Sequence, residues 1–238
     1  MNYPNTVFRS PRTLSILAVV GLGSVVLCHF LAAFLGIAQI IDPQRAIDLD
    51  GGDRSIWLLG QSLLALANVA AFLGAVVFFL IWLFRVHKNL DALEPSNREF
   101  TPGWAVAWWF IPFANLVKPF QAVREVWWDS DPEINNEPTF LSASLKSAPR
   151  FMGMWWGFWI ASNIFANITS RVFDPDSMEG VELTGVLFLI GGILTAIAGV
   201  LAIKVVREIT SRQELRHANL ASQGHHSPPP PPDFGGSV

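Results

Sequence analysis

Charged side chains are scarce in this chain of 238 residues, where Asp, Glu, Lys and Arg make up 15% of the sequence. A typical soluble domain carries about 25%. Hydrophobic residues make up 51% and gather in long uncharged runs, a pattern typical of membrane-spanning helices. The formal net charge of −3, without a basic nucleic-acid-binding motif, excludes a bulk attraction to nucleic acid.

Cysteine is also scarce, since Cys28 is the single one and lies within an apolar run. One cysteine excludes a disulfide within the chain, and no local zinc-ligand spacing occurs. The sequence also lacks a Ser–His–Asp arrangement, an HExxH motif and a P-loop, although a dispersed active site would leave no such pattern. We therefore expect no metal site and no cofactor, and the sequence favours a non-enzymatic protein.

Four runs are long enough to cross a hydrocarbon core, which needs roughly 20 residues of helix. They cover residues 14–41, 56–84, 151–170 and 183–206. Backbone groups in lipid must be hydrogen-bonded internally, so these runs are predicted to be helices. The first run exceeds the core of a signal peptide, which is about 7–15 residues, and is interpreted as a retained helix.

A fifth apolar stretch, residues 102–128, is interrupted. Its uninterrupted part, 103–113, covers about half a bilayer, and Pro112 would kink or break a helix that continued through it. Pro119 suits the first turn of a new helix. That helix would be amphipathic, with three apolar residues on one face: Phe120, Val123 and Trp127. The pattern predicts a short helix, a break and an amphipathic helix, either re-entrant or interfacial.

The distribution of lysine and arginine indicates whether this segment crosses the membrane. If it does not cross and the amino terminus is cytoplasmic, 13 of the 16 basic residues are cytoplasmic. The other three are Arg45, Arg54 and Arg171. If it crosses, the basic stretch near the carboxy terminus moves outside, against the positive-inside rule. We therefore expect four crossings with both termini in the cytoplasm.

The predicted fold class is an all-α membrane protein with four transmembrane helices and a broken, re-entrant or interfacial segment on the cytoplasmic side. Its parts are a cytoplasmic amino terminus (1–13), a membrane domain (14–212) and a proline-rich cytoplasmic tail (213–238). Five consecutive prolines at 228–232 favour polyproline II and a disordered tail. A partner module could dock there, but a solvated tail is the simpler interpretation.

The run PGWAVAWWFIPFANLVKPFQAVREVW, preceded by Trp82, Arg85 and Asn89, resembles the signature of a bacterial membrane family known as domain of unknown function 4328. The resemblance covers roughly residues 58–212. It implies a bacterial multi-pass protein of the cell membrane, and it supplies no catalytic residue, ligand or partner.

Nine of the ten tryptophans fall on the cytoplasmic side in the favoured topology, so a symmetric interfacial belt does not explain them. Basic groups beside an apolar wall suit an anionic lipid headgroup. The candidate residues for such a site are Arg85, Trp104, Trp108, Lys118 and Arg124. The favoured interpretation is an interfacial anchor that holds the broken helix in place, and the headgroup site is the alternative.

Four polar residues fall inside the predicted spans: His29, Asn68, Asn163 and Asn167. Polar groups at this depth are costly and are expected to point into the bundle. The favoured interpretation is hydrogen bonding between helices, and the alternative is a small polar or proton-handling site.

Gly153 and Gly157 have the spacing that lets helix backbones approach closely. Packing within the same chain is favoured, and packing on a second protomer is the alternative. Glu125 and Asp129 lie four residues apart near the inner interface and are interpreted as solvated.

Two functions follow as hypotheses. The first is a non-enzymatic scaffold or interaction protein at the inner leaflet. The second is binding or transport of an anionic lipid or small molecule through segment 102–128. The partners expected are membrane lipids and either another protein or a second copy of the chain.

Overall fold

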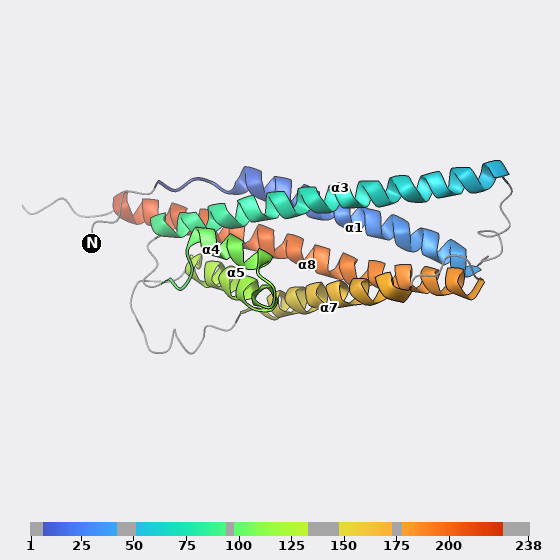
Figure 1. Cartoon of the computed structure of the whole chain (residues 1–238). Helices are drawn as coiled ribbons and strands as arrows, with labels where there is room; N and C mark the ends of the chain where they lie inside the picture. Colours follow the sequence, from blue (N-terminus) through green and yellow to red (C-terminus); the bar gives the residue numbers. More distant parts are fainter. Residues whose placement is uncertain (1–6, 42–50, 94–97, 133–147, 173–177, 226–238) are drawn as a thin grey trace, which may run out of the picture.

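The computed structural model describes residues 7–41, 51–93, 98–132, 148–172 and 178–225. This part of the chain is helical and contains no strand. Four long helices lie side by side in Figure 1: α1 (Arg12–Ile41), α3 (Gly51–Asn89), α7 (Arg150–Val172) and α8 (Met178–His225). The predicted all-α class is therefore confirmed, and each predicted span falls within one of these helices.

Three of the long helices are apolar and long enough to cross a membrane, namely those that include residues 12–38, 56–92 and 182–222. The helix α7 is not among them, because Ser, Asn and Thr residues interrupt the apolar residues of its second half. The count of four crossings therefore stays a prediction. The acidic residues at positions 42–53 and 174–179 lie outside the residues and side chains that the structure describes.

The helices α1 and α8 pack closely because glycines face the neighbouring backbone. A Cβ added at Gly36 would lie 2.7 Å from the carbonyl oxygen of Gly185. A Cβ added at Gly192 would lie 3.1 Å from the carbonyl oxygen of His29. These distances leave no room for a larger side chain, so small residues set the helix separation here.

The segment between α3 and α7 forms the predicted short helix, break and amphipathic helix. The short helix α4 (Pro102–Ala107) begins at Thr101, whose side chain accepts a hydrogen bond from the Trp104 N–H at 3.4 Å. Two 3₁₀ turns follow, η2 (Trp108–Phe110) and η3 (Ala114–Leu116), and Pro112 lies between them. The amphipathic helix α5 (Lys118–Asp129) has Pro119 in its first turn and buries Val123 and Trp127.

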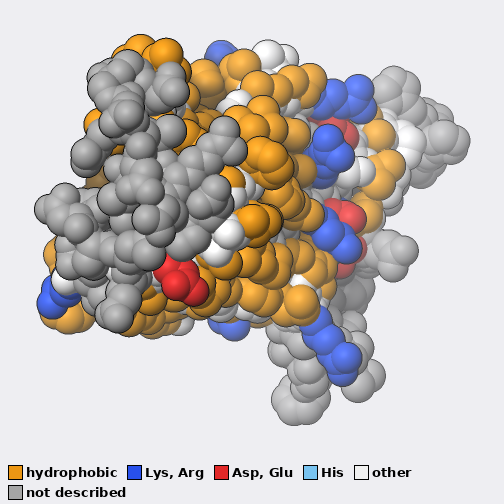
Figure 2. All heavy atoms as spheres, turned by 90° about the vertical axis from the view of Figure 1, so that its right-hand side faces the viewer, with side chains coloured by type: hydrophobic (Ala, Val, Ile, Leu, Met, Phe, Trp, Pro, Cys, Tyr) orange, Lys and Arg blue, Asp and Glu red, His pale blue; other side chains and the backbone are white. Residues whose placement is uncertain are grey.

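Most of the buried core lies at one end of the bundle, where α4 and α5 pack beside α3 and α8 (Figure 1). It unites α3, α5, α7 and α8 through Leu83, Val126, Trp155 and Ile209 among others. Toward the other end, large apolar side chains are exposed, such as Leu66 and Phe34 at 66% and 69%. Figure 2 shows hydrophobic side chains over most of the described part of one face, with most of the charged side chains along one edge. Exposed apolar surface of this extent marks contact with lipid or protein.

The helix α8 is longer than the apolar run that predicts it, because it continues from residue 206 to His225. Gln213 is fully buried, Arg216 is 4% exposed and Leu220 packs against the core, so α8 stays part of the folded bundle to Leu220 and continues as helix to His225. The prediction that a disordered tail begins at 213 is wrong for these residues. Residues 226–238, which include the five prolines, lie outside the described part of the chain.

Candidate functional site

The end of the bundle that holds α5 is organised around the side-chain amide of Gln213. Its Nε2 donates hydrogen bonds to the carbonyl oxygen of Val86 at 2.7 Å and to Ser130 Oγ at 3.1 Å. Its Oε1 accepts one from Asn89 Nδ2 at 3.1 Å. Both amide protons and the oxygen are therefore used, which offsets the cost of burying the group. The amide joins α8 to the end of α3 and to the residue that follows α5.

Two further polar groups tie flanking segments to this end. Asn89 Nδ2 also donates to the carbonyl oxygen of Arg9 at 2.9 Å, and Asn89 Oδ1 accepts from the Arg9 N–H at 3.3 Å. Arg216 donates to the carbonyl oxygens of Leu93 at 3.0 Å and Asp131 at 2.9 Å. Arg212 pairs with the Asp131 carboxylate at 2.7 Å. The segment before α1 and the ends of α3 and α5 are thereby held on α8.

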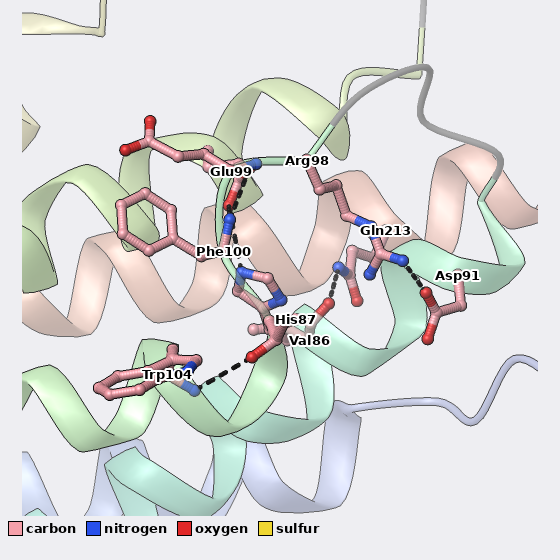
Figure 3. Close-up of polar contacts among 10 residues, drawn as sticks. Val86, His87, Asp91, Arg98, Glu99, Phe100, Trp104 and Gln213 are labelled. Carbon is pink, nitrogen blue, oxygen red and sulfur yellow. Dashed lines mark hydrogen bonds and ion pairs between the residues drawn. The ribbon is translucent and has the colours of Figure 1, made fainter.

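A buried histidine and a carboxylate anchor the start of α4 (Figure 3). His87 is fully buried, and its Nε2 lies 3.2 Å from Glu125 Oε2. The Glu125 carboxylate also accepts hydrogen bonds from the backbone N–H groups of Glu99 and Phe100. His87 Nδ1 is buried without a hydrogen-bond partner among the described residues. The interpretation of Glu125 as solvated is therefore wrong, because its side chain is only 12% exposed and serves three donors.

The tryptophans at this end form a packed cluster rather than an open surface. Trp109 lies edge-on to Trp156 and Trp159, with ring centroids 5.8 and 5.6 Å apart, and Trp156 stacks on Trp159 at 4.6 Å. Trp156 Nε1 donates to the carbonyl oxygen of Leu116 at 2.9 Å. Trp82 Nε1 donates to Thr210 Oγ1 at 3.0 Å. The contacts of Trp109 and Leu116 fasten the turn between α4 and α5 onto α7, and the Trp82 hydrogen bond joins α3 to α8.

The turn itself exposes a series of large apolar side chains. Phe113 is 87% exposed and has a φ of 63°, and the Ala114 N–H donates to the carbonyl oxygen of Pro112 at 2.7 Å. This arrangement is a γ-turn of the rare type, which is strained for a residue with a side chain. The other exposed side chains of the turn are Phe110, Ile111, Leu116 and Val117.

The five candidate headgroup residues do not form one cluster. Trp104 and Trp108 contact each other with centroids 4.8 Å apart. Lys118 Nζ lies 5.3 Å from the ring centroid of Phe100, which packs with Trp108, and 3.4 Å from Glu99. Lys118 and Trp108 therefore lie near Phe100, and Trp104 joins them through Trp108.

The other two candidates lie apart from that group. Arg124 stacks on Trp128 at 4.7 Å and on Phe120 at 5.9 Å, so it lies on another side of α5. Arg85 is half-buried on α3 and shows no polar contact within the described residues. The headgroup site stays a prediction.

The four intramembrane polar residues lie apart as well. His29 and Asn68 are half-buried on α1 and α3. Asn163 and Asn167 are exposed on α7, where their amides donate to the carbonyl oxygens of Trp159 and Asn163 at 2.7 and 3.0 Å. The expectation that these two asparagines point into the bundle is wrong, because both are exposed on the surface of the described chain.

Gly153 and Gly157 are exposed on α7, and a Cβ added at either would meet nothing within 4 Å in the described structure. Packing within the same chain, the favoured interpretation, is therefore not their role among the described residues. The second-protomer alternative stays a prediction.

Sequence reasoning missed His87 and Gln213 altogether. Both lie where apolar residues recur at helical spacing, so this spacing could have predicted that their side chains are buried. Their partners are 38 and more than 80 residues away, which no local pattern indicates. Among the described residues, no three His, Cys, Asp or Glu side chains are grouped to hold a metal ion.

The described residues form an all-helical fold, with three helices able to cross a bilayer by length and composition and a broken helical segment docked at one end. The chain belongs to the family described as "Domain of unknown function (DUF4328)", whose family model matches residues 50–211. The resemblance seen in the sequence is thereby confirmed. No curated protein and no solved structure matches the chain.

Proposed function

We propose that this protein crosses the cell membrane four times, with both termini in the cytoplasm, and that segment 102–128 dips into the cytoplasmic leaflet. There it acts as a non-enzymatic scaffold that presents the turn between α4 and α5 to a membrane partner. The observation that carries the proposal is the exposed apolar turn, which is held rigidly by packed tryptophans and buried polar groups.

The depth of Trp109 supports insertion of the segment. Its ring lies 5.3 Å from that of Phe79, which is six residues before Arg85 and therefore about 9 Å along α3. It also contacts Trp159, nine residues after Arg150 and about 13 Å along α7. If Arg85 and Arg150 mark the membrane surface, the turn lies about 10 Å inside it.

The arrangement of basic residues supports the orientation. Lys204 of α8 lies 4.6 Å from the ring centroid of Phe151, in the first turn of α7. Arg85, Arg150 and Lys204 thus fall at the same end as the docked segment. The 23 residues of α7 extend about 34 Å beside α8, enough to cross a hydrocarbon core.

Photo-cross-linking in intact cells tests the scaffold. A benzophenone-bearing phenylalanine replaces Phe113, and the control replaces Phe72, which is 54% exposed on α3 away from the turn. The scaffold predicts a reproducible protein adduct from position 113 that position 72 does not give. Lipid adducts alone at both positions would contradict the scaffold and leave the lipid-binding alternative.

That alternative, binding or transport of an anionic lipid or small molecule through segment 102–128, has its own support. Lys118 lies over Phe100 and Arg124 lies over Trp128, so two cations are held against aromatic faces. Native mass spectrometry of the purified protein would detect a retained anionic lipid. Lipid retention that survives Arg85→Ala combined with Arg124→Ala would exclude the proposed headgroup residues.

A further inference from the structure

One face of α7 is open along most of the helix and combines glycines with asparagines. Counting about 100° per residue, five exposed residues fall within roughly 100° of arc. They are Gly153, Gly157, Ile164, Asn167 and Ile168. Asn163 lies at the edge of the same face. Ile164 and Ile168 are 56% and 55% exposed, and Ile160 within the same arc is half-buried, so the described chain leaves most of this face uncovered.

The glycines of this face differ from those that pack helices inside the chain. A Cβ added at Gly36 or Gly192 would crowd a neighbouring backbone, whereas one added at Gly153 or Gly157 would meet open space. Helix α7 packs on α8 through Phe165, which lies about 60° around the helix from Ile168: a Cβ added at Gly191 would lie 3.3 Å from the Phe165 ring. The close approach that Gly153 and Gly157 permit is therefore unused within the described chain.

The asparagines give an independent indication that the face is covered. Each amide donates to its own helix, but neither side-chain oxygen has a hydrogen-bond partner within the described residues. Asn163 is 13 residues from Arg150, about 20 Å along α7, which places it in the hydrocarbon. Exposed polar groups at that depth face a partner or a water-filled cavity rather than lipid.

We propose that a second copy of this chain packs on this face of α7, so that the protein forms a two-fold symmetric dimer. The proposal rests on α7 crossing the membrane, which is part of the proposed function. All copies share one orientation in the membrane, so a two-fold axis along its normal brings each residue opposite itself at equal depth.

Because the same face of both copies would be in contact, the face must be complementary to itself, and this face of α7 is. Asparagine both donates and accepts hydrogen bonds, so Asn167 can pair with Asn167 of the second copy. Glycine allows the two backbones to approach. No charged residue lies between Arg150 and Arg171, so like charges do not oppose the contact within the membrane.

Disulfide cross-linking of the full chain in native membranes tests the dimer, in a Cys28→Ser background with a copper–phenanthroline oxidant. Ile164→Cys places a thiol at the centre of the face. Ser162→Cys is the matched control, because it lies at nearly the same depth but about 200° around the helix. The dimer predicts a species of twice the chain mass for Ile164→Cys and little or none for Ser162→Cys.

A second substitution shows whether close packing is required. Gly157→Leu should reduce the Ile164→Cys cross-link at least tenfold, because the added side chain separates the helices. Gly60→Leu is the control, since Gly60 is also exposed with open space around its Cβ position, but on α3. Equal cross-linking in both variants would overturn a glycine-mediated contact.

Labelling with a membrane-impermeant maleimide separates failure of the dimer from failure of the topology. If Ile164→Cys is protected from label in intact and opened membranes but does not cross-link, the dimer is wrong and the crossing by α7 stands. If it is labelled from either side without detergent, α7 does not cross as proposed. Cross-linking to a protein of another mass would overturn the second copy as the occupant.

Discussion

The imidazole of His87 lies 3.2 Å from the carboxylate of Glu125, and the pair is buried where α5 docks on α3. The same carboxylate accepts the backbone N–H groups at Glu99 and Phe100, which lead into α4. The Glu125 side chain thus connects α5, to which it belongs, with the residues that lead into α4. This makes Glu125 the residue on which the docking of the segment depends most.

Glu125→Gln should destabilise the protein by about 1–3 kcal/mol, because the amide offers one acceptor oxygen where the carboxylate offers two. At least one of the three donors would then lose its partner. Thermal unfolding in detergent measures the change. Glu99→Gln is the control, since the Glu99 side chain is 68% exposed and its pair with Lys118 should contribute little. Equal shifts in the two variants would show that Glu125 has no special role.

Gln213→Leu should cost about 3 kcal/mol of stability, since it removes three buried hydrogen bonds and leaves the Val86 carbonyl and Asn89 without a partner there. Arg207→Leu provides a polar-to-leucine control on an exposed position of the same helix. The same unfolding measurement applies. A Gln213→Leu protein as stable as Arg207→Leu would mean that the network contributes nothing.

Two substitutions at Phe113 separate backbone strain from membrane insertion. Phe113→Gly should raise stability in detergent by up to about 1 kcal/mol, because glycine adopts positive φ without strain. Phe113→Asp should instead cost about 2–3 kcal/mol in a bilayer, where a charge at depth is unfavourable.

In water the Phe113→Asp change would be nearly neutral, since the side chain is 87% exposed. Val7→Asp, at an 80% exposed residue before α1, is the control. Protein yield in membranes and unfolding in reconstituted bilayers report both effects. Equal behaviour of Phe113→Asp and Val7→Asp in bilayers would place the turn in water.

The sequence predicted much of the fold because its strongest signals are local. Long apolar runs located all four long helices, and Pro112 and Pro119 located the break and the start of α5. The amphipathic pattern of α5 also identified its buried face, including Val123 and Trp127. Each of these features depends on residues within a few turns of one another.

The site was less predictable because its contacts join distant segments. The burial of Glu125 depends on His87, and that of Gln213 depends on Asn89 and Ser130. Hydropathy ends a helix where polar residues begin, so it stopped α8 near residue 206, although α8 continues to His225 and buries the polar side chains of Gln213 and Arg216 on the way. Nor did hydropathy show that Asn163 and Asn167 face outward, since that depends on which side of α7 packs on α8.

The return of segment 102–128 to the side from which it enters is the central claim, and cysteine labelling on either side of the segment tests it most directly. Glu99→Cys and Arg150→Cys, each in a Cys28→Ser background, place exposed thiols before and after the segment. An impermeant maleimide is applied to right-side-out and inside-out membrane vesicles. We expect both cysteines to react only in inside-out vesicles. Reaction of the two cysteines from opposite sides would show that the segment crosses, and would contradict the proposed topology.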